Sequence, residues 1–414
     1  MKYVGLNPDD ENIKIFQEMN PRVLYIISLF ICLMLSFQSC QKELQAERQL
    51  DDIIEDIEDS VKANIYAYPA RVLAEKDYYY YKDAVYTGSN PSQNNIFITS
   101  PEEWIGDFDD TKLCLNLTAG SHEITIMVYD FSWQLVAEKT LSIVAAPKPI
   151  RKLESTDELP VFFFGDSIIN QNKNQLGKDF TRELNSICDG KIRLVGSKSY
   201  RGTQWEYCMY LENVFTGKND VNNALNNPFY NPDSIEPDEL GEDGFNKRVD
   251  FQWYFETICG NGKYPKLFYI SIGANDMGRS DGWSGEIIPD NAKRLISLCK
   301  KIKSACDDIE GGESNIVIKL FNHQTYPLNI NELLGYGIDQ RRIIQNYAWD
   351  VYYEAVTSSF NGVSDYVEIV DCASHFDWER GYNPNGDNIH MNSFGASQYA
   401  NILVDDFLAD PRFD

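Results

Sequence analysis

Positive charge is scarce in this chain. Its 37 Lys and Arg residues face 63 Asp and Glu residues, so the formal net charge is −26, and the pI is near 4.5. Because an acidic surface repels phosphate groups, this deficit argues against nucleic acids and anionic membrane surfaces as partners. A neutral glycan is compatible with such a charge, although acidity can equally serve solubility alone.

Histidine and cysteine are also sparse. The 414 residues include four histidines and nine cysteines, and no cysteines show the paired spacing of zinc ligands. Beyond residue 40 the cysteines are an odd, scattered set, which does not predict a disulfide framework. We expect most of them to be buried small side chains. They are Cys114, Cys188, Cys208, Cys259, Cys299, Cys306 and Cys372.

The N-terminus carries an apolar run over residues 23–37, which follows Arg22 and ends shortly before Cys40. The run is short for a spanning helix and predicts a signal peptide. With a small residue before the cysteine, the segment is similar to a bacterial lipoprotein signal, which implies lipidation of Cys40 and a cell-envelope location. An uncleaved anchor would give the same topology. Residues 1–18 are acidic for such a leader, so Met19 competes with Met1 as the start.

A chain of this length predicts more than one domain. Alternating apolar residues at 124–128 and further strand-like runs at 135–137 and 140–144 indicate a small all-β sandwich. This stretch resembles an immunoglobulin- or fibronectin-type module. We therefore divide the chain into a signal (1–40), an acidic tether (41–60), the β-sandwich module (61–146), a linker (147–159) and a C-terminal domain (160–414).

The module contains a run of four tyrosines, Tyr78–Tyr81. Such a run could present a face on which sugar rings stack. The alternative is a packed strand with two tyrosines on each side. The sequence leaves both interpretations open and favours the packed strand.

The C-terminal part alternates apolar β runs with segments of helical period, which predicts a three-layer α/β/α sandwich around a parallel five-stranded sheet. The runs are 161–164, 192–195, 267–272, 316–321 and 367–370. An aromatic insertion between the second and third runs includes residues 226–232 and 253–255. It either shapes a binding site or packs against the core.

Three short strings in this part contain residue types used in acyl transfer. They are Gly165-Asp166-Ser167, Gly273-Ala274-Asn275-Asp276 and Asp387-Asn388-Ile389-His390. The first two follow apolar runs, so we expect them at the carboxyl edge of the sheet, where open α/β sheets bind ligands. Taken alone, Asn275 could be a simple turn residue, and Asp276 is expected to brace its loop.

A serine hydroxyl becomes nucleophilic only with a base in reach and a third group that orients the base. Of the four histidines, only His390 has a carboxylate three residues earlier, so Asp387 can select the tautomer that accepts the proton of Ser167. Ser167 can also cap a helix, which would place its own N–H where an oxyanion is stabilised.

The remaining histidines have weaker claims. His323 ends an apolar run and is a candidate substrate contact or a loop-packing residue. His375 follows Asp371 by four residues and is the competing base, whereas His122 lies in the N-terminal module and should be remote.

The three strings, over residues 158–410, resemble the SGNH (GDSL-type) hydrolase family. This resemblance implies that Ser167 is the nucleophile and that Asp387 and His390 complete the triad. It also implies that Asn275 and a glycine of a second block form the oxyanion hole with the N–H of Ser167. We assign that glycine to Gly202.

The expected activity is that of a serine esterase that removes acetyl or other short acyl groups from an oligo- or polysaccharide and needs no metal or organic cofactor. The surrounding loops are rich in Asn, Asp, Tyr and Trp, which suit sugars better than alkyl chains. The alternatives are a non-catalytic glycan-binding surface lipoprotein and a lipase or lysophospholipase. Candidate substrate contacts are Asp166, His323, Trp205 and Trp283.

Overall fold

The structure is a computed structural model, and every statement below concerns the residues that it describes. These are 64–85, 95–99, 112–150, 152–153, 158–170, 175–196, 206–208, 210–216, 227–277, 287–322, 340–360, 366–382 and 390–414. All of them belong to one compact unit, Ile57–Asp414.

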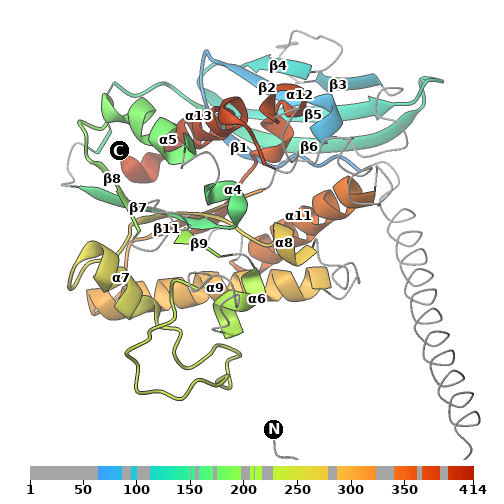
Figure 1. The fold of residues 1–414 in the computed structure, drawn as a ribbon. Helices are drawn as coiled ribbons and strands as arrows, with labels where there is room; N and C mark the ends of the chain where they lie inside the picture. The colour runs from blue at the N-terminus through green and yellow to red at the C-terminus, as the bar shows by residue number, and fades with distance from the viewer. Residues whose placement is uncertain are drawn as a thin grey trace, which may run out of the picture. The chain divides into compact units, whose positions relative to one another are not determined.

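The central sheet contains five parallel strands in the order β12-β11-β10-β7-β8 (Figure 1). They are β7 (Leu159–Gly165), β8 (Ile192–Val195), β10 (Leu267–Ser271), β11 (Val317–Phe321) and β12 (Val367–Val370). Every strand coincides with one of the five apolar runs, so the predicted parallel sheet is confirmed. β8 lies on one side of β7, and β10 lies on the other side, so the order in which strands are added changes direction between β7 and β10. Open α/β sheets bind ligands at the carboxyl ends of the strands at such a point.

A sixth strand, β9 (Glu206–Tyr207), is a difference from the prediction. It pairs in parallel with Phe164 and Gly165 of β7. β8 pairs with β7 only as far as Phe162, so β9 continues the sheet beyond the end of β8. β9 has only two residues and no apolar run, so nothing in its hydrophobic pattern marks it.

Both faces of the sheet are buried at its centre, which explains why β7 and β10 are apolar without alternation. On one face Phe163 packs against Phe180 and Tyr269, with ring centroids 5.5 and 4.9 Å away. On the other face Phe162 meets Phe255 at 6.2 Å. The first face is covered by α5 (Gln175–Asn185) and α13 (Ser393–Ala409), and the opposite side carries α7 (Phe251–Cys259), α9 (Ile287–Glu310) and α11 (Gln340–Ser359) (Figure 1). The three-layer α/β/α architecture is therefore confirmed.

The aromatic insertion serves packing in its described part. Phe229, Tyr254 and Phe255 are buried, and Phe229 meets Phe164 at a centroid distance of 5.1 Å. These rings fill the space between the sheet and α7, so the packing interpretation holds for them.

The N-terminal part forms two small sheets. A four-stranded sheet has the order β1-β6-β5-β3, and β2 pairs with β4. The strands are β1 (Ala70–Leu73), β2 (Asp77–Tyr81), β3 (Asn95–Thr99), β4 (Lys112–Asn116), β5 (Gly120–Tyr129) and β6 (Leu135–Ala146). The two sheets share one buried apolar core, as in a sandwich. β1 and β6 run parallel, a departure from a purely antiparallel arrangement.

The segment predicted as a linker contributes to the core of the catalytic layer. Lys152 and Leu153 are buried, and the Lys152 Nζ donates a 2.9 Å hydrogen bond to the carbonyl oxygen of Asp410. These two positions therefore attach the chain to the α/β layers instead of spacing it away from them.

Ionic contacts join the N-terminal strands to the α/β layers. Lys319 on β11 is fully buried, with its Nζ 3.1 Å from Glu368 and 2.9 Å from Asp410. Arg71 on β1 reaches Glu368 at 2.5 Å. We call this group the buried charge cluster; it comprises Arg71, Lys319, Glu368, Asp406, Asp410 and Arg412. Three cations face three carboxylates, so the cluster is balanced in charge.

Candidate active site

Ser167 lies two residues beyond the end of β7, as the first residue of α4 (Ser167–Asn170). Only glycine fits at the end of β7, because a Cβ on Gly165 would lie 2.1 Å from the carbonyl oxygen of Ser271 on β10. The amide of Asp166 donates to the same oxygen at 3.3 Å. α4 has only four residues, so its helix dipole is small. The Ser167 N–H is one of the backbone donors that have no partner within the helix.

His390 is the histidine that meets Ser167. The distance from its Nε2 to the Ser167 Oγ is 2.9 Å, across 223 residues of sequence. This is the separation required for a base that takes the serine proton. Both residues are half-buried, which leaves the hydroxyl and the ring partly accessible.

Asn275 lies shortly after the end of the neighbouring strand, β10. It lies in α8 (Ala274–Met277), directly after β10, and Ser271 of β10 pairs with Gly165 of β7. The two strands end at the same level, so α4 and α8, which contain Ser167 and Asn275, both follow the carboxyl edge of the sheet (Figure 1).

Asp276 braces this edge, as expected. Its Oδ2 accepts the backbone N–H of Leu211 at 2.7 Å, and its Oδ1 accepts that of Glu212 at 3.3 Å. These are the first two residues of α6 (Leu211–Thr216), so Asp276 caps a helix that is distant in sequence. Both carboxylate oxygens of Asp276 therefore accept hydrogen bonds that hold the start of α6.

The loop that carries His390 is fixed by Asn392, a residue that the sequence argument missed. Its Nδ2 donates to the carbonyl oxygens of Arg380 and Tyr382, each at 2.7 Å. Its Oδ1 accepts the N–H of Gly395 at 3.0 Å and caps α13. The available signal was an asparagine directly before a helix, the residue type that favours an N-cap.

The other two histidines that the structure describes, His122 and His375, are hydrogen-bonded elsewhere. The Nδ1 of His375 is 2.6 Å from the carbonyl oxygen of Tyr79, and the ring is 5 % exposed. His122 on β5 bonds the carbonyl oxygen of Thr118 at 2.7 Å. The structure thus pairs Ser167 with His390 and places His375 against the N-terminal module.

Asp166, a candidate substrate contact, is 1 % exposed. A substrate could not reach so buried a side chain without movement of its neighbours, which favours a structural role. The other predicted site residues lie outside the described residues; they are Asp387, Gly202, His323, Trp205, Trp283 and Cys40.

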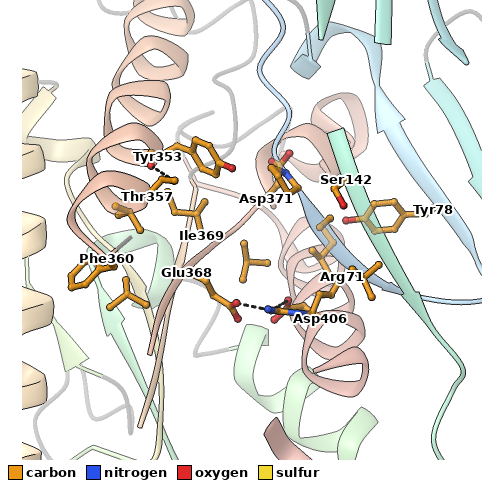
Figure 2. A pocket seen from close by; sticks show the side chains of 17 residues that line it. Arg71, Tyr78, Ser142, Tyr353, Thr357, Phe360, Glu368, Ile369, Asp371 and Asp406 are labelled. Carbon is orange, nitrogen blue, oxygen red and sulfur yellow. Dashed lines mark hydrogen bonds and ion pairs between the residues drawn. The ribbon is translucent and has the colours of Figure 1, made fainter. Parts of the chain in front are cut away.

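A cavity of about 270 Å³ lies between the N-terminal strands and the α/β layers (Figure 2). Arg71, Tyr78, Tyr353, Glu368 and Asp406 line it. Asp166, Ser167, Asn275 and His390 do not contribute to its wall, so this cavity is separate from the candidate active site.

Seven cysteines are free thiols in the described part, six of them buried and Cys114 half-buried. This confirms the expectation of small buried side chains. No group of three or more His, Cys, Asp or Glu side chains is arranged to hold a metal ion within the described ranges. Among the helices that could be described, none has the length and apolar character needed to cross a membrane.

Comparison with known proteins gave structural similarities only. No family model matches the chain, and no curated protein matches it. A family 3 carbohydrate esterase of Clostridium thermocellum is similar at 16% identity, over 60% of this chain and 94% of the other, with a TM-score of 0.36. A carbohydrate acetylesterase of Sinorhizobium meliloti is similar at 11% identity, over 60% and 98% of the chains, with a TM-score of 0.35.

A third similar structure is longer. It is a carbohydrate esterase family 2 enzyme with a carbohydrate-binding domain from Corynascus thermopiles, at 13% identity over 83% of this chain and 97% of the other, with a TM-score of 0.33. Similarities at these values do not decide the activity of this chain.

Proposed function

We propose that this protein is a serine esterase that acts through an acyl-enzyme. The observation that carries the proposal is the 2.9 Å contact between the Ser167 Oγ and the His390 Nε2, at the edge of a parallel sheet where β7 and β10 end together. A serine and a histidine so placed are the minimal pair for nucleophilic acyl transfer.

In the proposed reaction the Ser167 Oγ attacks the ester carbonyl carbon while the His390 Nε2 takes the hydroxyl proton. Collapse of the tetrahedral intermediate breaks the bond to the alcohol, and His390 returns the proton to the departing oxygen. Water then attacks the acyl-enzyme with His390 again as base, which releases the acid and restores Ser167.

The remaining roles belong to this proposal. Asp387 would orient the ring of His390. The oxyanion would be bound by the backbone N–H groups of Ser167 and Gly202 and by the side-chain amide of Asn275. Asn275 lies on the same sheet edge as Ser167, which supports its assignment.

Covalent labelling tests the activity against the alternative of a non-catalytic glycan-binding protein. A fluorophosphonate probe should label the wild-type protein at Ser167, and Ser167→Ala should lose the label. A folded wild-type protein that neither takes up the probe nor hydrolyses any simple ester would overturn the esterase proposal.

For the substrate we propose short acyl groups on an oligo- or polysaccharide. The support is the polar and aromatic character of the sequence around the three motifs, which suits sugar hydroxyls and ring faces. Hydrolysis of aryl esters should fall steeply beyond about four acyl carbons, because a closed pocket excludes further methylenes. Faster turnover of octanoyl than of acetyl esters would favour a lipase instead.

We further propose that the protein is held at the cell envelope by lipid on Cys40. The support is the apolar run over residues 23–37 that precedes this cysteine. Labelled palmitate should be incorporated into the wild-type protein and not into Cys40→Ser. Label that persists in the variant would refute the anchor without affecting the esterase proposal.

A further inference from the structure

The tyrosine run of the N-terminal module forms β2, and two of its rings enclose a histidine of the catalytic layer. Tyr78 and Tyr80 are buried on the same side of the strand. Their ring centroids lie 4.1 and 4.3 Å from that of His375. These two tyrosines pack against protein, so they do not form a face for sugar stacking.

The same histidine is hydrogen-bonded to the backbone of β2. The His375 Nδ1 lies 2.6 Å from the carbonyl oxygen of Tyr79, and since a carbonyl only accepts, the Nδ1–H donates. Burial lowers the pKa of His375, with Asp371 acting in the opposite sense. A neutral ring with its proton on Nδ1 fits this environment.

A second set of contacts joins the end of β2 to α12 (Trp378–Gly381) and α13 (Figure 1). The Tyr81 hydroxyl donates to the Asp377 Oδ2 at 3.5 Å, and Gln398 donates to that hydroxyl at 3.5 Å. The N–H of Asp377 donates to the Gln398 Oε1 at 3.2 Å. Tyr81, Asp377 and Gln398 therefore close a ring of hydrogen bonds among β2, α12 and α13.

Asp377 is also hydrogen-bonded to α12. Its Oδ1 accepts the N–H of Arg380 at 3.1 Å, and its carbonyl oxygen accepts the N–H of Gly381 at 2.7 Å. The third and fourth residues of this short helix are therefore both bonded to Asp377, the residue that precedes it.

Phe376, which lies between His375 and Asp377, packs against Gly381 of α12 and Gly395 of α13. A Cβ on Gly381 would lie 2.3 Å from its ring, and one on Gly395 would lie 2.8 Å away. The carbonyl oxygen of Gly381 also accepts the N–H of Asn392 at 2.7 Å. The contacts are thus continuous from β2 to the residues that immediately follow His390.

We propose that β2 of the N-terminal module positions His390, through His375, Asp377 and α12. This inference rests on the proposed esterase function, and it makes the module a structural part of the active site. His375, Tyr81 and Asp377 are positioning residues: they touch neither Ser167 nor His390, and they act by fixing the segment to which the loop of His390 is attached.

The decisive variants are His375→Ala and Tyr81→Phe in the full chain. We expect kcat for an aryl acetate to fall by about 10- to 100-fold with KM changed less than about twofold, since a misplaced base slows the chemical step and leaves binding intact. His375→Asn is the rescue variant, because its amide nitrogen can take the place of the Nδ1 donor. It should recover most of the kcat.

The matched control is Ile126→Ala. Ile126 is fully buried in β5 within the core of the module, and it makes none of the hydrogen bonds or ring contacts of His375. Its truncation therefore destabilises the module and leaves those contacts their own partners. Assayed well below its melting temperature, this variant should keep wild-type kcat. An equal loss of kcat in Ile126→Ala would show a general effect of module stability and would overturn the positioning role.

Amide hydrogen exchange gives a readout besides activity. The N–H groups of Asn392 and Gly395 should exchange faster in the His375→Ala protein than in the wild type, and their protection should return in His375→Asn. If His375→Ala does not fold, Tyr81→Phe carries the same test. An active wild type together with unchanged kcat and exchange in a folded variant would overturn this inference alone, whereas a wild type inactive on every ester would overturn the esterase proposal.

Discussion

The carbonyl oxygen of Ser271 lies where a side chain on Gly165 would begin. The two residues are directly paired between β10 and β7, and a Cβ on Gly165 would be 2.1 Å from that oxygen. The strands can approach so closely only because glycine ends β7. This contact determines where the chain turns out of the sheet, and so where Ser167 is presented.

The first prediction concerns the pairing of nucleophile and base. Ser167→Ala and His390→Ala should each lower kcat by about 10⁴- to 10⁶-fold, and the double variant should be no worse than either, because the two residues act as one unit. Steady-state rates with an aryl acetate would measure this. His122→Gln is the control, because His122 lies on β5 of the N-terminal module and bonds the carbonyl oxygen of Thr118 there. Additive losses in the double variant would contradict a shared role.

The second prediction concerns the oxyanion. Asn275→Ala should lower kcat by about 10²- to 10³-fold as a lost donor, while the fluorophosphonate probe still labels Ser167 slowly. Asn275→Asp should lose at least as much, since a carboxylate repels the developing negative charge. Wild-type kcat in both variants would leave Asn275 as a turn residue.

The third prediction separates the two functions of Asn392. Asn392→Ala loses both the helix cap and the donors to Arg380 and Tyr382, so it should be destabilised by about 1 kcal/mol and have reduced kcat. Asn392→Ser keeps a capping oxygen but cannot reach the two carbonyls. It should melt near the wild type yet share the kcat defect, as thermal denaturation and kinetics on the same samples would show. Full activity in Asn392→Ser would mean that the cap alone matters.

The fourth prediction is acid sensitivity of folding. Burial alone would raise the pKa of Glu368, but the charges of Lys319, Arg71 and Arg412 outweigh it and lower the pKa to about 2. A carboxyl group with a lowered pKa stabilises the fold above its unfolded value, near 4.5, and loses that contribution as the pH falls towards 2. Up to about 3 kcal/mol should be lost over this window.

Denaturant unfolding between pH 2 and pH 7 would measure it. Glu368→Gln should flatten the profile below pH 4.5. Asp406 acts in the opposite sense at higher pH, because burial raises its pKa to about 6 although Lys319 opposes this; its contribution falls as the pH rises from about 4 to 6. An unchanged acid profile in Glu368→Gln would contradict the role assigned to the buried charge cluster.

The sheet and the serine–histidine pair could be predicted because local sequence encodes them strongly. A strand buried on both faces is an unbroken apolar run, as in β7 and β10, and the turn after it carries the polar residue that the edge exposes. β9 escaped prediction because its two residues, Glu206 and Tyr207, are too few to form an apolar run. Asn392 was missed because its side-chain amide donates to carbonyl groups ten and twelve residues earlier in the chain. A helix-cap motif covers only neighbouring residues, so it cannot predict hydrogen bonds at that sequence separation.

The tyrosine run shows a different limit. A period of two places two tyrosines on each side of a strand, whatever lies opposite. The sequence therefore could not show that Tyr78 and Tyr80 would enclose His375, almost 300 residues later. Likewise, Lys152 and Leu153 sit in a stretch with the composition of a linker, and only tertiary contacts reveal their burial.

The contact between the Tyr68 amide and Asp371 spans 303 residues, and the contacts of β2 with His375 span a similar length. At a synthesis rate of about 5–20 residues per second, the N-terminal strands leave the ribosome about 15–60 seconds before these partners exist. During that time Tyr78 and Tyr80 lack the ring of His375, which later packs against them. The aromatic surface left uncovered in this interval is exposed during translation, and slower translation of the residues between the module and β12 would lengthen its exposure.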